Sequence, residues 1–118
     1  MGDLSRVDQK FSIRQIALSY VGAQTNQEVI AATVNYGRHV LHSVVVSADT
    51  TGSFTLKENL SGARAVIVPT MYFGNNGGVG LEDMLLKITP NASVELTTVT
   101  TTNVSILIIY HTERGGGV

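Results

Sequence analysis

Hydrophobic and polar residues alternate along several short segments of the chain, which is the pattern of β-strands that bury one face. Val94 and Leu96, for example, alternate with Glu95 and Thr97. No segment keeps apolar residues at helical spacing over three turns. Clusters of Gly, Asn and Asp interrupt the pattern about every eight to twelve residues, a spacing that is typical of an all-β sandwich or barrel.

About eight strands are predicted from this alternation and from the turn residues between them. Eight antiparallel strands in about 100 residues fit two packed sheets of four, so we expect an all-β, jelly-roll-like sandwich. In the first strand the apolar positions slip by one residue near Arg14 and Gln15, which predicts a β-bulge. The predicted strands cover residues 11–20, 28–34, 38–47, 53–58, 63–73, 79–88, 93–99 and 104–111.

The predicted core consists of the apolar residues that face inward from the two sheets. A chain of this length buries roughly 65 % of its unfolded surface, so such a core needs no disulfide or metal to support it. The core residues that we expect are Ile13, Leu18, Val44, Val46, Phe54, Leu56, Val66, Val68, Leu86, Ile88, Val94, Leu96, Ile106 and Ile108.

The chain of 118 residues is long enough for one domain. We expect residues 1–10 to form a polar N-terminal arm, residues 11–112 the β-sandwich, and residues 113–118 a flexible C-terminal tail. The first ten residues lack the apolar stretch of a secretory signal. The longest apolar runs are far shorter than the ~18 residues that span a bilayer, so no membrane partner is expected.

Composition narrows the possible partners and chemistries. Charged residues make up only 14 % of the chain, and the formal net charge is -1. A chain with so few cations cannot neutralise a row of phosphates, so direct binding of nucleic acid is not expected. The chain has no cysteine, which excludes disulfides, thiolate metal sites and thiol nucleophiles.

Three of the predicted strands are apolar on both faces, including residues 63–73. Both faces of such a strand must be covered, and in a two-layer domain the second cover can be another subunit. We therefore expect a homo-oligomer whose subunit contacts include Leu41, Val45, Leu107 and Ile109. An alternative stays open, in which these strands lie at the centres of the sheets and are crossed by loops.

Histidines are the first residues to test for catalysis or metal binding. His39 and His42 lie an odd number of positions apart on one strand, so they should point to opposite faces. His111 could approach either of them, but no acidic residue is spaced with them as a metal triad. Asp49 begins an Asp-Thr-Thr-Gly stretch that is similar to an aspartic protease motif, but the remaining sequence does not look like such a protease and a turn explains these residues. We predict no enzyme and no cofactor or metal site.

A glycan-binding module is an alternative reading of the same sequence. Its site would lie on loops around Tyr36, Tyr72 and the pair Asn75 and Asn76. The absence of tryptophan weakens this alternative, because sugars bind on exposed aromatic platforms.

Four stretches share a pattern of β-branched strands and short turns, at 28–32, 37–46, 89–96 and 104–110. In this pattern the region 27–110 resembles small β-sandwich virion proteins of tailed bacteriophages. The resemblance implies a head decoration (cement) protein, commonly a trimer, that is made in the host cytoplasm and sits on the capsid surface against the major capsid protein. A tail or fibre component is the alternative. In the decoration protein, Leu4 and Val7 of the arm would contact the capsid.

Overall fold

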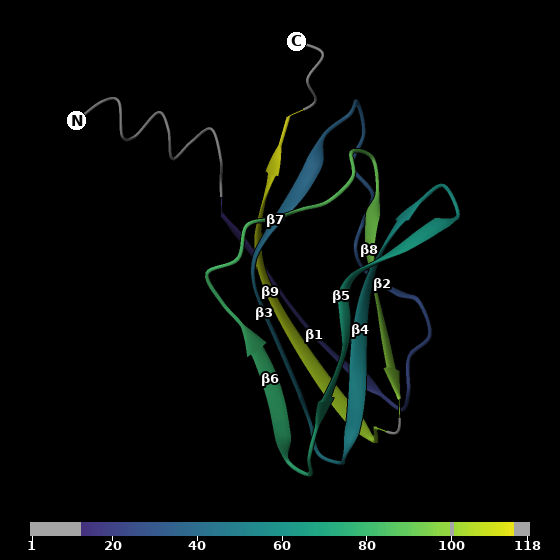
Figure 1. Cartoon of the computed structure of the whole chain (residues 1–118), viewed down its shortest axis with the longest axis vertical. Coiled ribbons are helices and arrows are strands. Elements are labelled where there is room, and N and C mark those ends of the chain that lie inside the picture. Colours follow the sequence, from purple (N-terminus) through teal and green to yellow (C-terminus); the bar gives the residue numbers. More distant parts are fainter. Residues whose placement is uncertain (1–12, 100, 115–118) are drawn as a thin grey trace, which may run out of the picture.

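The computed structural model describes residues 13–99 and 101–114, which form β-strands and no helix (Figure 1). The strands are short and joined by turns, as their β-branched residues and the Gly, Asn and Asp clusters between them predict. They are β1 (Arg14–Val21), β2 (Gln27–Ile30), β3 (Arg38–Ala48), β4 (Gly52–Leu60), β5 (Ala63–Phe73), β6 (Gly77–Leu81), β7 (Leu86–Lys87), β8 (Ser93–Val99) and β9 (Asn103–Glu113).

The strands form two antiparallel sheets that pack as a sandwich. The five-stranded sheet has the order β1-β9-β3-β6, with β7 also paired to β3, and the four-stranded sheet has the order β2-β8-β4-β5. If β6 and β7 are counted as one interrupted strand, the first strand pairs with the last and the second with the last but one, as in a jelly roll. The predicted fold class is therefore confirmed.

The strand predicted at 79–88 is divided in the structure. β6 pairs with the end of β3, and β7 pairs with Val40 and Leu41 near its beginning. Between these two pairings β3 shifts register against β9, and the N–H of Met84 donates to the carbonyl of His42 at 3.1 Å. The interruption between β6 and β7 thus lies beside a bulge in β3.

The prediction of a β-bulge in the first strand is wrong for the described residues. β1 pairs with β9 in one unbroken register, from Arg14 opposite Tyr110 to Val21 opposite Asn103. The sequence pattern therefore placed the bulge in the wrong strand.

The core lies between the sheets and contains most of the predicted residues. Phe54 and Leu56 are fully buried, and Leu18 and Leu86 are partly buried. Two predictions are wrong, because Ile13 is 62 % exposed and Val66 is 58 % exposed. Ile13 precedes β1, and Val66 lies in the end of the β4–β5 hairpin that projects from the sandwich in Figure 1.

β5 is the edge of the four-stranded sheet, and most of its side chains are exposed, so within one chain residues 63–73 are not covered on both faces as predicted. Only Val68 and Phe73 of this strand are buried. β3 and β9, in contrast, have neighbours on both sides. The arm residues Leu4 and Val7 lie outside the described residues.

Candidate functional site

The outer face of the five-stranded sheet is the candidate functional site, because a large part of it carries no charged side chain. Side chains directly opposite each other on paired strands share a face, so the strand registers identify the outward set. None of these residues is charged. They are named here the uncharged face: Gln15, Ala17, Ser19 and Val21 of β1, Asn103, Ser105, Leu107 and Ile109 of β9, Ser43, Val45 and Ser47 of β3, and Gly78 and Gly80 of β6.

The centre of the uncharged face is hollowed. A shallow recess of about 370 Å³ lies over β1, β9 and β3, and Ala17, Val45 and Leu107 line it. The three serines in the lining, Ser19, Ser105 and Ser47, form a row across the strands next to the row of Ala17, Leu107 and Val45. Small residues of this kind keep the sheet surface low, so another sheet or strand can approach closely.

The predicted contact residues divide between this face and the core. Val45, which is 37 % exposed, lies on the uncharged face, as do Leu107 and Ile109, which are half-buried. The expectation that Leu41 faces outward is wrong, because its side chain is fully buried in the core. The register shift between Leu41 and Ser43 turns Leu41 to the same side as Val44.

The opposite outer face, on the four-stranded sheet, is charged and paired. Arg64 Nε donates to Glu95 Oε1 at 2.7 Å, and Asn59 Nδ2 donates to Glu95 Oε2 at 2.9 Å. The hydrogen bond from Arg64 lowers the pKa of Glu95, although burial of the carboxyl group opposes the shift. Thr55 and Thr70 share a hydrogen bond on the same face. The polar side chains on this face therefore have partners within the chain.

Three side chains in contact lie at one end of the uncharged face: His42, His111 and Glu113. His42 Nε2 lies 2.6 Å from His111 Nδ1, so one of these nitrogens donates and the other accepts. His111 Nε2 lies 3.4 Å from Glu113 Oε2. These contacts tie β3 to β9 at the bulge. Glu113 was not predicted as a partner of His111, although residues two apart on a strand lie on the same face.

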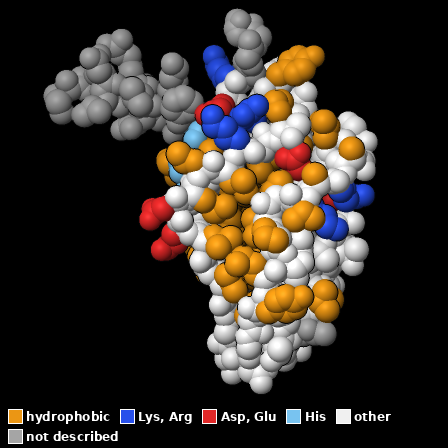
Figure 2. All heavy atoms as spheres, viewed as in Figure 1, with side chains coloured by type: hydrophobic (Ala, Val, Ile, Leu, Met, Phe, Trp, Pro, Cys, Tyr) orange, Lys and Arg blue, Asp and Glu red, His pale blue; other side chains and the backbone are white. Residues whose placement is uncertain are grey.

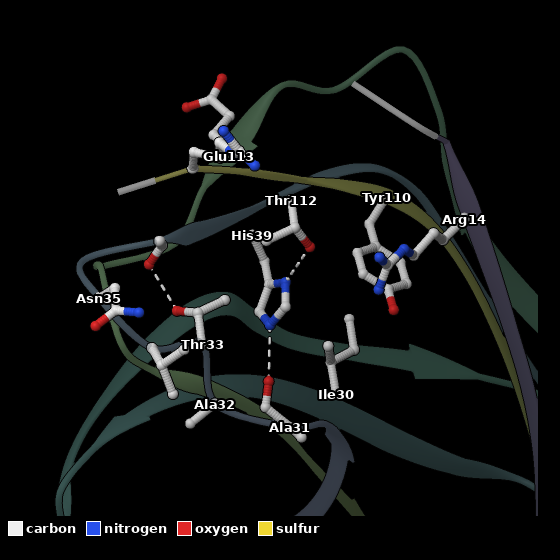
Figure 3. A pocket seen from close by; sticks show the side chains of 13 residues that line it. Arg14, Ile30, Ala31, Ala32, Thr33, Asn35, His39, Tyr110, Thr112 and Glu113 are labelled. Carbon is white, nitrogen blue, oxygen red and sulfur yellow. Dashed lines mark hydrogen bonds between the residues drawn. The ribbon is translucent and has the colours of Figure 1, made fainter. Parts of the chain in front are cut away.

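His39 points inward, as its spacing from His42 predicts, and lines a recess of about 810 Å³ at one end of the sandwich (Figure 3). Its Nε2 donates to the carbonyl of Ala31 at 2.7 Å, and its Nδ1 accepts from the hydroxyl of Thr112 at 2.9 Å. Burial lowers the pKa of His39, the bond to Ala31 opposes this shift, and the charge of Arg14 adds to it. Both ring nitrogens are thus engaged in holding the fold.

Asp49 has a structural partner as well. Its carboxylate accepts from the N–H and the side-chain amide of Asn103, each at 2.9 Å. These two bonds lower the pKa of Asp49. Asp49 therefore connects the β3–β4 turn to the start of β9, which supports the interpretation of Asp-Thr-Thr-Gly as a turn.

The residues predicted for a glycan site do not come together. Tyr36 precedes β3, whereas Asn75 accepts from the N–H of Thr51 at 2.9 Å, just beyond the other end of β3. The eleven residues of β3 separate the two loops by roughly 35 Å. Tyr36 and Tyr72 are each exposed, but they belong to opposite ends of the sandwich.

A second apolar surface lies along one flank of the sandwich. Figure 2 shows apolar side chains gathered in a band between the two sheets. Partly buried residues of β5 and β6 lie along this flank, including Met71 and Val79. The band is the margin of the core where the edge strands β5 and β6 leave it open.

Among residues 13–99 and 101–114, no group of three or more His, Asp or Glu side chains is arranged so that it could hold a metal ion. The same residues contain no helix of the length and apolarity needed to cross a membrane.

No protein-family model matches the chain, and no curated protein matches its sequence. Solved structures match its fold. A subunit of the Bacillus endospore appendages, a family of disulfide-linked pili, matches with a TM-score of 0.54 and 9 % identity over 91 % of this chain and 90 % of that chain. A chain of the cyanophage Pam1 capsid matches with a TM-score of 0.45 and 12 % identity over 86 % of each chain. The nucleoplasmin-like N-terminal domain of Drosophila FKBP39 matches with a TM-score of 0.45 and 13 % identity, over 84 % of this chain and 89 % of that chain.

Proposed function

We propose that this protein is a non-enzymatic structural subunit that associates with copies of itself through the uncharged face. The observation that carries the proposal is the contrast between the two outer faces. One face holds the Arg64–Glu95 ion pair and its polar neighbours. The uncharged face, in contrast, crosses four strands without a charged residue, includes Val45, Leu107 and Ile109, and ends before the acidic side chain of Glu113. Depletion of charge at a patch is the compositional mark of a subunit contact.

The size of the face indicates what kind of contact it makes. Four strands about 4.8 Å apart and about seven residues of about 3.4 Å each give roughly 450 Å². A standard interface buries about 800 Å² on each partner, so one such contact is weak by itself. Weak contacts suit an assembly in which symmetry repeats them many times.

We further propose that this assembly is a virion and that the protein is a capsid decoration (cement) subunit. It would form a trimer on the capsid surface, contact the major capsid protein through Leu4 and Val7 of the arm, and bridge neighbouring capsomers. The support is the resemblance of residues 27–110 to small phage virion proteins, together with the jelly roll. A phage tail or fibre component is the alternative.

The appendage subunit offers a second line of support and a difference. That protein, which shares the fold, belongs to a pilus, so a jelly roll of this kind serves in a repeated assembly there. Its pili are disulfide-linked, whereas this chain has no cysteine. Contacts between copies of this chain would therefore be non-covalent.

Light scattering after size-exclusion chromatography tests the self-association. We expect the mass of the wild-type protein to rise with concentration, and Val45→Lys to keep the fold but to lose association through the uncharged face, so that its mass rises less. Thr70→Lys is the matched control, because Thr70 is exposed on the charged outer face. A wild-type protein that stays monomeric at every concentration would overturn the proposal, as would a Val45→Lys variant that associates like the wild type.

Electron microscopy and heat resistance of particles made without the protein test the cement role. We expect density to be missing from the outside of the capsid and the heads to release DNA at a lower temperature. Heads of unchanged appearance and unchanged resistance would retire the decoration function. Loss of density from the tail alone would favour the alternative.

A further inference from the structure

Counting β6 and β7 as one interrupted strand, the described sandwich has four edges, and three of them are blunted. An edge presents unpaired N–H and C=O groups, and natural proteins protect it with short strands, bulges, charges or proline. β2 has four residues and a register shift, and β6 has five residues, of which three are glycine. β5 is long but has two register shifts against β4, and it contains Arg64 and Pro69.

Beyond its first residue, Arg14, β1 lacks all of these protections. It has eight residues in unbroken register with β9, without proline or bulge, and no residue from Gln15 to Val21 is charged. β9 is its neighbour on one side only. The longest regular and uncharged edge in the described chain is therefore the free side of β1.

The backbone groups that face this edge can be identified. The N–H of Gly22 donates to the carbonyl of Thr102 at 2.7 Å, which continues the register of β1 and β9. In an antiparallel pair alternate residues bond to the same neighbour, so Gln15, Ala17, Ser19 and Val21 turn their N–H and C=O groups to the free edge. The side chain of Gln24 donates to the carbonyl of Val21 at 3.4 Å, as this orientation requires.

We propose that the free edge of β1 pairs with β1 of a second copy, antiparallel and centred on Ala17. Gln15 then lies opposite Ser19 of the second copy, and about six hydrogen bonds form between the two strands. Residues from Gln15 to Ser19 are uncharged in both strands, so the pairing places no like charges opposite each other there. The pairing joins two five-stranded sheets into one.

The inward side chains of β1 support pairing with a second copy. Ile16, Leu18 and Tyr20 are only partly buried where they pack against the core. In the pairing centred on Ala17, Ile16 lies opposite Leu18 of the second copy, so each apolar side chain covers the other. The uncharged faces of the two copies also become continuous, which doubles a face of roughly 450 Å² to about 900 Å².

Edge pairing is separate from association through the uncharged face, because it uses backbone groups and not the side chains of that face. Ala17→Pro removes the N–H that points to the free edge and leaves the bonds to β9, which come from the even-numbered residues. Ala17→Thr is the matched control, since it keeps the N–H and favours a strand.

Hydrogen exchange measured by NMR at high and low protein concentration tests the proposal. We expect the amides of Ala17 and Ser19 to exchange about tenfold more slowly at high concentration in the wild type and in Ala17→Thr. In Ala17→Pro the exchange of Ser19 should not depend on concentration. Fast exchange of both wild-type amides at every concentration would overturn edge pairing, even if Ala17→Pro does not fold.

Val45→Lys separates this inference from the proposed function. If the edge pairs by itself, Val45→Lys retains the slow exchange of Ala17 and Ser19 at high concentration while association through the uncharged face is lost. Loss of that protection in Val45→Lys would refute a pairing that is independent of the face.

Discussion

Replacement of Leu41 by alanine tests the placement of this residue in the core. Leu41 is fully buried and packs in the main core between the sheets. Replacing a fully buried leucine by alanine costs about 3 kcal/mol, from lost burial and from the cavity that remains. For a domain of this size, that loss lowers the melting temperature by about 10 °C. It is a large fraction of the roughly 5–15 kcal/mol by which such domains are stable.

Urea unfolding at low protein concentration, where self-association does not contribute, is the assay. We expect the midpoint to fall at an unchanged slope, which indicates lost stability and not a changed unfolded state. Val45→Ala is the control, because Val45 is 37 % exposed and its truncation should cost less than about 1 kcal/mol. A loss below about 1 kcal/mol for Leu41→Ala would refute the placement of Leu41 in the core.

Three further predictions concern single groups. The pKa of Glu95 is lowered in the folded state, so its ionised carboxylate stabilises the fold above the unfolded pKa. This stabilisation is lost as the pH falls through the folded pKa. The free energy of unfolding of Glu95→Gln should therefore depend less on pH in acid than that of the wild type. The pKa of His39 is also lowered in the folded state, so the folded protein is stabilised while His39 is neutral. Wild-type stability should therefore fall as the pH drops below about 6.5, and it should fall less in His39→Asn. A Cβ on Gly78 would lie 2.4 Å from the carbonyl oxygen of Val46, whereas a Cβ on Gly80 meets nothing closer than 3.7 Å. Gly78→Ala should therefore lower the free energy of unfolding by about 1–3 kcal/mol, and with it the urea midpoint, whereas Gly80→Ala should leave the midpoint unchanged. Equal midpoints for the two variants would refute the close approach of β6 to β3.

The site was predicted in part. Val45, Leu107 and Ile109 lie on an outer sheet face, as alternation from Val44, Val46, Ile106 and Ile108 predicts, although their role in contact stays a prediction. Leu41 was assigned to the wrong side, since alternation counts residues and cannot see that His42 is extra in β3. The contact between His42 and His111 joins residues far apart in the chain, so no local pattern could reveal it.

The sequence by itself determined that this protein is an antiparallel sandwich and, within each regular strand, which side chains share a face. The physical reason is that the period of two is a local property of extended backbone. Only the tertiary structure decided which strands are central and which are edges, where the bulge reverses the sides, and that one outer face is charged while the other is not. These features depend on which distant strands pair and in what register, and that follows from the packing of the whole core.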